Sequence, residues 1–427
     1  MKILKLSSYY YPENVASSHL ADDLKEACLK ANIAAEVFAP VPCRGVSEEV
    51  RNKYKKIKYE ELEEGRITVH RFSMFREGKN PVLRAFRYIL VNIIQYFKGI
   101  NAKDIDIVYS ASTPPTQGML CGLVAKKLTK KYGRKVPFVF NLQDIFPDSL
   151  VNANMTHEGS FIWKLGRKIE DCTYRHADKI IVISPGMREN ILKKGVPADK
   201  ITVIPNWIDT DEVKPVPKEE NRLYKEFNIN PQKFTVVYAG NFGASQGADI
   251  VIKAAEALKD ENDIQFVIFG SGSEFAAAKQ YAEEHQLKNV IINALLPQSR
   301  VSEVYSMGDA AAVTCKKGVG GSGMPSKVWS IMACNTPVIA SFDLNSELDD
   351  ILHDSGAGVC VEPEDSQILA ESILKFSKQA GKYMNYGRNS RNYVLRHASR
   401  DICVSRYIEL FKNIARIPNP ENRETGI

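Results

Sequence analysis

The segment AAAVTCKKGVGGSGMPSKVWSIMA, residues 310–333, decides the fold class of this chain. It begins with a short apolar run typical of a buried strand, continues into a loop rich in glycine and lysine, and ends in a helical pattern. The same order of strand, loop and helix recurs on both sides of this segment. Such alternation predicts an α/β protein whose parallel sheets are covered by helices on both faces.

Two runs of this alternation, each about 200 residues long, predict two doubly wound, Rossmann-like domains that face an interdomain cleft. The predicted strands are residues 2–7, 35–39, 67–72, 105–110, 138–142, 179–183 and 201–204 in the first run, and 234–239, 264–269, 290–294, 310–314, 337–341 and 358–361 in the second. The domains are therefore expected at 1–208 and 232–399. The polar, proline-rich stretch 209–231 is predicted to link them. A last helix near 400–416 could cross back to the first domain, and the tail 417–427 is predicted to be flexible.

Composition narrows the class of protein. The chain has 427 residues, of which 44% are hydrophobic and 25% charged, which excludes extensive disorder. No apolar run reaches the roughly 18 residues of a membrane span. The charged start does not resemble a signal peptide, which predicts a cytoplasmic protein. The 8 cysteines are scattered, so neither a disulfide framework nor a structural zinc site is expected.

Charge is unevenly distributed along the chain. Residues 1–215 hold 34 Lys and Arg and 25 Asp and Glu, which gives +9; the remainder then holds 57−34=23 and 51−25=26, which gives −3. A basic half favours an anionic partner, either phosphate or a lipid surface. A solvated basic face is the alternative.

The loop that follows residues 310–314 has the chemistry of a phosphate or diphosphate site. Its glycines allow close approach of the backbone to a ligand, and Lys316, Lys317 and Lys327 add positive charge. Pro325 suits the first turn of a helix, whose positive end favours an anion. A glycine loop without a ligand is the alternative. Residues 318–323 match the dinucleotide fingerprint literally but follow the fourth strand of their domain, so NAD is not expected.

Other loops after strands also carry polar groups. Residues 240–247 suit a sugar or phosphate oxygen, whereas Gly270 and Gly272 fit a tight turn equally well. In the first domain, residues 8–19 combine aromatic and amide side chains, and residues 143–148 place carboxylates after a central strand. The two Asp-x-Asp patterns, at 104–106 and 209–211, have no histidine or further carboxylates in the same loop, so no metal is expected.

The helix predicted at 81–98 mixes basic and aromatic residues with a long apolar face. It could lie on an anionic membrane surface, or it could pack into the core of the first domain. Its basic residues are dispersed and no nucleic-acid reading motif is present, so nucleic acid is not an expected partner.

Several of these segments together resemble the family 4 glycosyltransferases, which have the GT-B fold. The resemblance rests on residues 325–341, 203–209, 238–243, 7–13 and 141–148, and it extends from residue 1 to about 415. Residues 141–148 and Pro325-Ser-Lys are most similar to one subgroup, the N-acetyl-L-fucosamine transferases of O-antigen synthesis and the colanic-acid glycosyltransferases.

The resemblance implies a hexosyltransferase that retains the anomeric configuration and uses neither a metal nor a cofactor. Its donor would be a UDP-sugar, expected to carry an N-acetylated 6-deoxy hexosamine. Its acceptor would be a polyprenyl-diphosphate-linked saccharide for surface polysaccharide, such as O-antigen, capsule or exopolysaccharide. The first domain would bind the acceptor and the second the donor. The protein would act in the cytoplasm, peripherally on the inner face of the cell membrane.

The resemblance also assigns roles to residues of this chain. The expected catalytic residues are Lys327, Asp144 and Gln143. The expected donor-binding residues are Asn241, Gly243, Gln246, Gly270, Gly272, Leu295, Leu296, Gly320, Gly321, Ser322, Gly323, Met324, Pro325, Ser326, Lys327, Ser330 and Glu347. Among these, Leu295 and Leu296 would meet the base, and Glu347 the ribose or sugar. The expected acceptor-binding residues are Tyr11, Pro12, Asn14 and His19.

The chain departs from the family pattern at several positions. Ser322 and Ser330 replace two glutamates, Asn241 and Gln246 replace a diphosphate-binding arginine and lysine, and Gln143 replaces a histidine. We interpret these as a variant site in which Lys327, with Lys316 or Lys317, neutralises the leaving diphosphate. Two alternatives remain: a sugar-nucleotide epimerase of similar fold, and a non-catalytic nucleotide-sugar-binding partner of a polysaccharide assembly complex.

Overall fold

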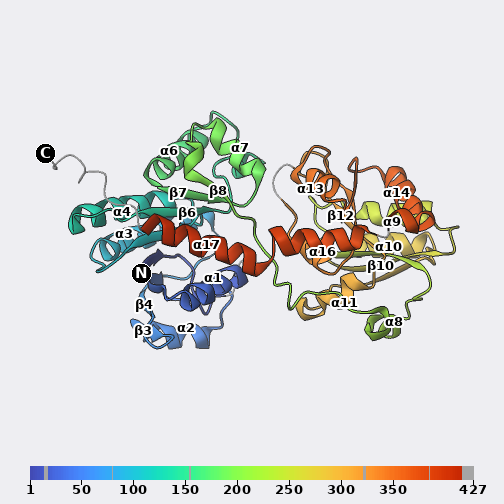
Figure 1. Ribbon diagram of the computed structural model, residues 1–427, viewed down its shortest axis with the longest axis horizontal. Coiled ribbons are helices and arrows are strands. Elements are labelled where there is room, and N and C mark those ends of the chain that lie inside the picture. The colour runs from blue at the N-terminus through green and yellow to red at the C-terminus, as the bar shows by residue number, and fades with distance from the viewer. Residues whose placement is uncertain (14–17, 79, 153–154, 321–323, 384, 416–427) are drawn as a thin grey trace. The chain divides into compact units, whose positions relative to one another are not determined.

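The computed structural model describes residues 1–13, 18–78, 80–152, 155–320, 324–383 and 385–415 (Figure 1). The chain forms two compact units: unit 1 comprises Met1–Pro205 with Val404–Ile427, and unit 2 comprises Asn206–Cys403. The tail predicted to be flexible lies outside the described residues.

Unit 1 contains an 8-stranded sheet in the order β3-β4-β2-β1-β5-β6-β7-β8. Its strands are β1 (Lys2–Leu6), β2 (Ala34–Pro40), β3 (Tyr59–Leu62), β4 (Ile67–Phe72), β5 (Ile107–Ala111), β6 (Phe138–Leu142), β7 (Lys179–Val182) and β8 (Ile201–Val203). All neighbours pair in parallel except the edge strand β3, which is antiparallel to β4. The predicted parallel sheet therefore carries one further, antiparallel strand at this edge, where the polar segment Tyr59–Leu62 gave no strand signal.

Helices cover both faces of this sheet. They are α1 (Ser18–Lys30), α2 (Glu48–Lys55), α3 (Pro81–Gly99), α4 (Gln117–Tyr132), α5 (Asp148–Asn152), α6 (Phe161–His176) and α7 (Pro185–Lys193), with a 3-10 turn η1 (Ala198–Lys200). One face packs Leu4, Val108 and Phe138 against α4, α6 and α7, and residues of α3 join the same cluster. On the other face, Val37 and Val69 pack with α1.

Unit 2 contains a 6-stranded parallel sheet in the order β11-β10-β9-β12-β13-β14. The strands are β9 (Phe234–Asn241), β10 (Ile264–Ser271), β11 (Val290–Ala294), β12 (Ala310–Thr314), β13 (Val338–Ser341) and β14 (Gly358–Val361). The helices are η2 (Lys218–Glu220), α8 (Leu223–Glu226), α9 (Asp249–Ala257), α10 (Phe275–Glu284), η3 (Gln298–Arg300), α11 (Val301–Ser306), α12 (Lys327–Ala333), α13 (Glu347–Ser355), α14 (Ser366–Lys378), α15 (Ala380–Tyr383) and α16 (Tyr386–His397).

Alternate side chains of the unit 2 strands enter two cores. Val237 and Ala239 of β9 pack with α11, α12, α13 and α16, whereas Val236 and Tyr238 pack with α9, α10 and α14. Burial on both faces explains why these strands are continuous apolar runs in the sequence.

The stretch 209–231, predicted to be a linker, is instead packed into unit 2. Val213, Leu223, Tyr224 and Ile229 are buried in its core. These apolar positions are separated by polar and proline residues, so the sequence showed no helix or strand periodicity there.

The last helix, α17 (Arg400–Ala415), contributes its residues from Val404 onward to unit 1. Its Phe411 is fully buried and packs edge to face on Tyr109 of β5, with ring centres 5.4 Å apart. This contact attaches the C-terminal helix to the sheet face that also carries α1.

We expect Phe411→Ala to lower the free energy of unfolding of unit 1 by about 3–5 kcal/mol, because it leaves a large cavity beside Tyr109. Lys412→Ala, one residue further on an exposed position, should change stability by less than about 0.5 kcal/mol. Denaturant unfolding followed by circular dichroism measures both. Equal effects of the two changes would contradict this account of the helix.

Candidate functional site

The strand order of unit 2 reverses direction between β9 and β12. In such a sheet, ligands bind beyond the carboxyl ends of the strands at the point of reversal. The loops after these two strands lie in contact, because the backbone N–H of Lys316 donates to the carbonyl oxygen of Ser245 over 3.1 Å. The loop 240–247 and the loop that begins at Cys315 therefore form one surface at this edge.

The side chain of Lys327 lies at this edge. Lys327 is the first residue of α12, and its Nζ lies 4.1 Å from the centre of the Tyr238 ring on β9. A Cβ atom at Gly240 would come within 2.7 Å of the same Nζ, so only glycine leaves room for the ammonium group there. The phenol face stabilises the cation in part.

The ammonium group of Lys327 is buried and has no hydrogen-bond partner among the described residues. Desolvation by burial lowers the pKa of Lys327 to about 8. A buried cation without a partner is costly, and an incoming anion would relieve that cost. This is the physical property expected of a group that binds phosphate.

Two amide side chains lie in the loop after β9. Asn241 Nδ2 donates to Gln246 Oε1 over 3.2 Å, and a Cβ at Gly243 would lie 2.7 Å from each of these two atoms. Asn241 Oδ1 lies so close to Gly272, whose φ is +114°, that a Cβ there would be 2.1 Å away. The structure thus brings Asn241, Gly243, Gln246 and Gly272 together, and the glycines are required by close approach.

The glycine loop after β12 is held differently from the expectation. The backbone N–H groups of Gly318 and Gly320 donate to the two carboxylate oxygens of Asp343, over 2.9 and 2.7 Å. A carboxylate of this chain therefore occupies two of the donors that the sequence assigned to a phosphate cradle. Gly321, Ser322 and Gly323 lie outside the described residues.

The remaining predicted donor residues surround this edge at various depths. Leu295, after β11, is 45% exposed, and its N–H donates to the carbonyl of Gly270 over 2.8 Å. Leu296 and Met324 pack partly into the core. Helix α12 begins at Lys327, so Pro325 and the exposed Ser326 precede it. Ser330 is buried within α12. Glu347 is the first residue of α13.

In unit 1, Gln143 and Asp144 follow β6, as predicted. Gln143 Nε2 donates to Asn141 Oδ1 over 2.9 Å, and Asn141 Nδ2 donates to the Tyr109 hydroxyl over 3.1 Å. This chain of hydrogen bonds orients Gln143. Asp144 is exposed beside a small cavity of about 20 Å³ that Ser112 also lines.

The predicted acceptor residues of unit 1 differ in their surroundings. Tyr11 is 60% exposed, and its carbonyl accepts a hydrogen bond of 2.7 Å from Arg71 Nη2. Pro12 is half-buried, and His19 is exposed on α1. Asn14 lies outside the described residues.

Sequence reasoning missed three residues that shape these edges. Tyr238 sits under Lys327, and Asp343 ties the glycine loop. Glu13 is buried and accepts hydrogen bonds from the backbone N–H groups of Tyr10, Cys43 and Arg44. Asp343 follows β13 and could have been found by its place after a strand. Tyr238 lies in the segment 238–243 that carries the family resemblance, but nothing in that segment indicated that its ring would contact Lys327.

Two negative findings concern the described residues only. No group of three His, Cys, Asp or Glu side chains among them is placed to hold a metal ion. No helix in that part of the chain is long and apolar enough to cross a membrane.

Comparison with protein families gives two adjoining matches. Residues 18–212 match the Glycosyltransferase Family 4 model, and residues 219–393 match the model of Glycosyl transferases group 1. One relative is WbjE of Pseudomonas aeruginosa, named as a probable glycosyltransferase: 28% identity covers 63% of this chain and 65% of that one. Another is WcaI of Escherichia coli K12, named for colanic acid biosynthesis: 26% identity covers 68% of this chain and 70% of that one. The chain thus matches about two thirds of the length of these relatives.

Solved structures show the same fold. Sucrose-phosphate synthase of Thermosynechococcus elongatus superposes with a TM-score of 0.69 at 17% identity, and the match covers 97% of this chain and 98% of that one. HepE of Anabaena, solved in complex with UDP, also gives 0.69, at 15% identity over 97% and 100% of the two chains.

The two family models together account for most of both units, and the two parallel-sheet units with their glycosyltransferase neighbours have the GT-B architecture. The chain therefore belongs to the family 4 glycosyltransferases, as its sequence motifs predicted.

Proposed function

We propose that this glycosyltransferase moves a sugar from a UDP-sugar donor to a polyprenyl-diphosphate-linked saccharide during surface polysaccharide synthesis. WcaI, named for colanic acid biosynthesis, supports the pathway class. HepE, solved with UDP and with UDP-glucose, supports the nucleotide. An N-acetylated 6-deoxy hexosamine as the transferred sugar rests on the resemblance to the N-acetyl-L-fucosamine transferases.

The buried, unpartnered ammonium group of Lys327 is the observation that carries this proposal. When the bond between the sugar and the diphosphate breaks, negative charge grows on the departing phosphate and the sugar becomes oxocarbenium-like. A fixed cation in a desolvated site stabilises that charge strongly, because it needs little reorganisation. The adjacent Asn241 and Gln246 add amide donors to the same edge.

We propose a reaction with retention and without a metal ion, in which Lys327 neutralises the leaving group together with Lys316 or Lys317. Lys316 is half-buried and its backbone is fixed to the loop after β9, whereas Lys317 is exposed and its backbone N–H donates to Glu364 over 3.1 Å. Lys316 is therefore the better placed second cation. Asp144 and Gln143 would serve the acceptor in unit 1.

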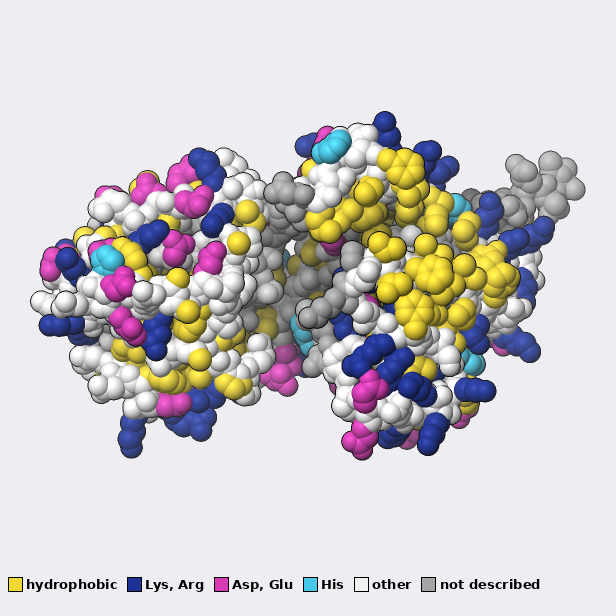
Figure 2. Space-filling model, turned by 180° about the vertical axis from the view of Figure 1, so that it is seen from behind, with side chains coloured by type: hydrophobic (Ala, Val, Ile, Leu, Met, Phe, Trp, Pro, Cys, Tyr) yellow, Lys and Arg dark blue, Asp and Glu magenta, His cyan; other side chains and the backbone are white. Residues whose placement is uncertain are grey.

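We also propose that unit 1 works against an anionic membrane surface on the cytoplasmic side. Helices α3, α4 and α6 lie side by side on one face of the sheet, and Figure 2 shows hydrophobic side chains gathered there. Exposed apolar residues on these helices are Val82, Leu83, Phe86, Ile89, Ile93, Phe97, Leu123, Phe161, Ile162 and Leu165. Helices α3 and α4 contain seven Lys or Arg residues and no Asp or Glu. Apolar area beside unbalanced positive charge is the chemistry of an interfacial surface.

A panel of UDP-sugars tested by thermal shift, followed by transfer of the stabilising sugar to a lipid-linked acceptor, tests the overall proposal. Transfer with release of UDP supports it. Release of UDP without an acceptor-linked product would indicate the epimerase, and binding without any turnover would indicate the non-catalytic partner.

We expect Lys327→Met to raise stability and abolish function together. At pH 7 the free energy of unfolding should rise by about 1–3 kcal/mol, because a buried charge without a partner is removed. The gain should shrink above pH 8, where the folded wild type deprotonates first. Turnover should fall by about 10²–10³-fold. UDP should raise the melting temperature of the variant much less than that of the wild type. Lys316→Met, with a less buried side chain, should not gain stability. A less stable Lys327→Met protein would contradict the account.

The affinity for UDP should depend on pH through Lys327. Its pKa of about 8 in the free protein is below the ordinary value, so the ammonium form is lost as pH rises through 8. Above that value the Kd for UDP should rise about tenfold per pH unit. Calorimetric titration from pH 6.5 to 9.5 measures this. Lys327→Met should bind weakly with a flat profile, and a flat wild-type profile would refute the role of the cation.

The membrane surface is tested by the double change Lys127→Glu and Lys130→Glu on α4. Sedimentation with vesicles containing anionic lipid should fall by about tenfold or more, because each cation near such a surface contributes about 1 kcal/mol. Lys259→Glu with Lys288→Glu, exposed in unit 2, gives a control of equal charge. Equal losses from the two pairs would indicate only an effect of net charge.

A further inference from the structure

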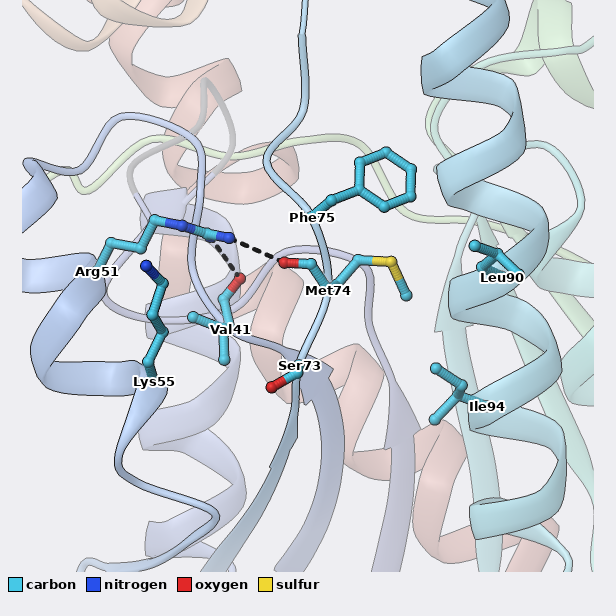
Figure 3. Close-up of a pocket in the computed structure, with 8 residues that line it drawn as sticks. All are labelled: Val41, Arg51, Lys55, Ser73, Met74, Phe75, Leu90 and Ile94. Atoms are coloured by element: carbon cyan, nitrogen blue, oxygen red, sulfur yellow. Dashed lines mark hydrogen bonds between the residues drawn. The ribbon is translucent and has the colours of Figure 1, made fainter.

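A groove of about 580 Å³ opens in unit 1 at the carboxyl ends of β2 and β4 (Figure 3). Residues that follow these two strands form its floor, α2 forms one wall and α3 forms the other. The lining residues are Val41, Arg51, Lys55, Ser73, Met74, Phe75, Leu90 and Ile94. The groove therefore belongs to the same edge of the sheet as the residues after β1 that were predicted to bind the acceptor, and none of its lining residues is among the predicted site residues.

The wall formed by α2 is cationic. Arg51 is 6% exposed, and its guanidinium donates to backbone carbonyls that include Val41, over 3.4 Å, and Met74, over 2.8 Å. Among the described residues no carboxylate forms a salt bridge with Arg51, so its positive charge is not neutralised. Lys55 lies one turn further on the same helix face, and its Nζ donates to Asn52 Oδ1 over 2.8 Å.

A second buried cation stands behind the groove. Arg87 of α3 is fully buried, and its Nε donates to the carbonyl of the groove residue Phe75 over 3.2 Å. Its Nη1 has no hydrogen-bond partner in the described part of the chain. Two acidic residues of this region are paired with arginines: Glu48 with Arg76, and Glu77 with Arg84. The residues that line the groove thus include two cations and no carboxylate.

The wall formed by α3 is apolar. Leu90 and Ile94 are one turn apart and face the groove (Figure 3). Phe75 stacks on Phe86 of the same helix, with ring centres 6.3 Å apart, and Phe86 is 52% exposed. The apolar surface thus continues out of the groove along α3. A cavity with cations on one side and a hydrocarbon-like surface on the other suits an amphiphile with an anionic head.

We propose that this groove binds the lipid phosphate of the acceptor: a phosphate group beside Lys55 and Arg51, with its isoprenoid chain lying along Leu90 and Ile94 of α3. The identification of this ligand as the acceptor rests on the proposed function, because a polyprenyl-diphosphate-linked saccharide carries both a phosphate group and an isoprenoid chain. A free phosphate would leave the apolar wall exposed to water.

The proposal is tested by calorimetric binding of farnesyl phosphate to the full-length protein. Lys55→Glu should weaken binding by about tenfold or more, because a charge-assisted hydrogen bond is replaced by repulsion. Lys53→Glu makes the same change of charge at an exposed position of α2 that does not line the groove, and it should leave the Kd within about twofold of wild type. Inorganic phosphate and farnesol, tested in parallel, should each bind far more weakly than farnesyl phosphate.

A second pair of variants keeps the test independent of the stability of α2. Ser73 is exposed on the floor of the groove, so the negative charge of Ser73→Asp should weaken farnesyl phosphate binding. Ser73→Asn introduces a side chain of nearly the same shape as aspartate but without the charge, and it should not weaken binding. Inorganic phosphate binding as tightly as farnesyl phosphate would overturn the lipid site, and farnesol binding as tightly would overturn the anion site. Equal losses from both members of either pair would also refute it.

The outcome can be separated from that of the proposed function. UDP binding should be unchanged in Lys55→Glu and Ser73→Asp, because neither residue lies in unit 2. Loss of farnesyl phosphate binding with UDP binding intact supports the groove. If wild type binds farnesyl phosphate but transfers no sugar, the groove stands and the transferase proposal fails.

Discussion

The ammonium group of Lys327 is held 4.1 Å from the Tyr238 ring, against a glycine, with no hydrogen-bond partner among the described residues. The ring offsets only part of the cost of this arrangement, because burial penalises the charge and lowers the pKa of Lys327. Three neighbouring features surround this ammonium group. Gly240 has no side chain where the group lies, and the face of the Tyr238 ring contacts it. The strand order of unit 2 reverses at the same edge of the sheet. A site that is strained when empty and relieved by an anion is the physical basis of donor binding in our proposal.

The described part of the glycine loop next to Lys327 is held by a carboxylate of the chain itself. Asp343 accepts hydrogen bonds from the N–H groups of Gly318 and Gly320, so the loop is secured by the chain itself. Its glycines serve that internal contact as well as close packing, since a Cβ at Gly320 would lie 2.6 Å from the ring of Phe342. In our proposal the charge of the diphosphate is therefore met mainly by lysine.

Unit 1 uses its carboxyl edge in another way. Its buried arginines, Arg51 and Arg87, donate hydrogen bonds to backbone carbonyls. Helices α3 and α4 expose apolar side chains and contain no acidic residue. The two properties meet along α3. An enzyme that takes its acceptor from a membrane needs both, because the chain of the lipid must be covered and its phosphate must be paired.

Much of the architecture was readable from local pattern. Every predicted strand is present, because strands buried on both faces are short apolar runs, and the glycine and amide loops lie after strands because parallel sheets place them there. The sequence also identified the family through ordered motifs. It failed where the signal was weak: the polar edge strand β3, the short helix α2, and the stretch 209–231, whose few apolar residues are too widely spaced to show periodicity.

What the sequence by itself determined was the class of the fold, the family and the residues at strand ends. Only the tertiary structure decided which of them act together. Each of these features joins residues that are far apart in the chain: Lys327 with the Tyr238 ring, Asp343 with the glycine loop, and α2 with α3 at the groove. The sequence could not show them, because desolvation and charge pairing depend on distance in space.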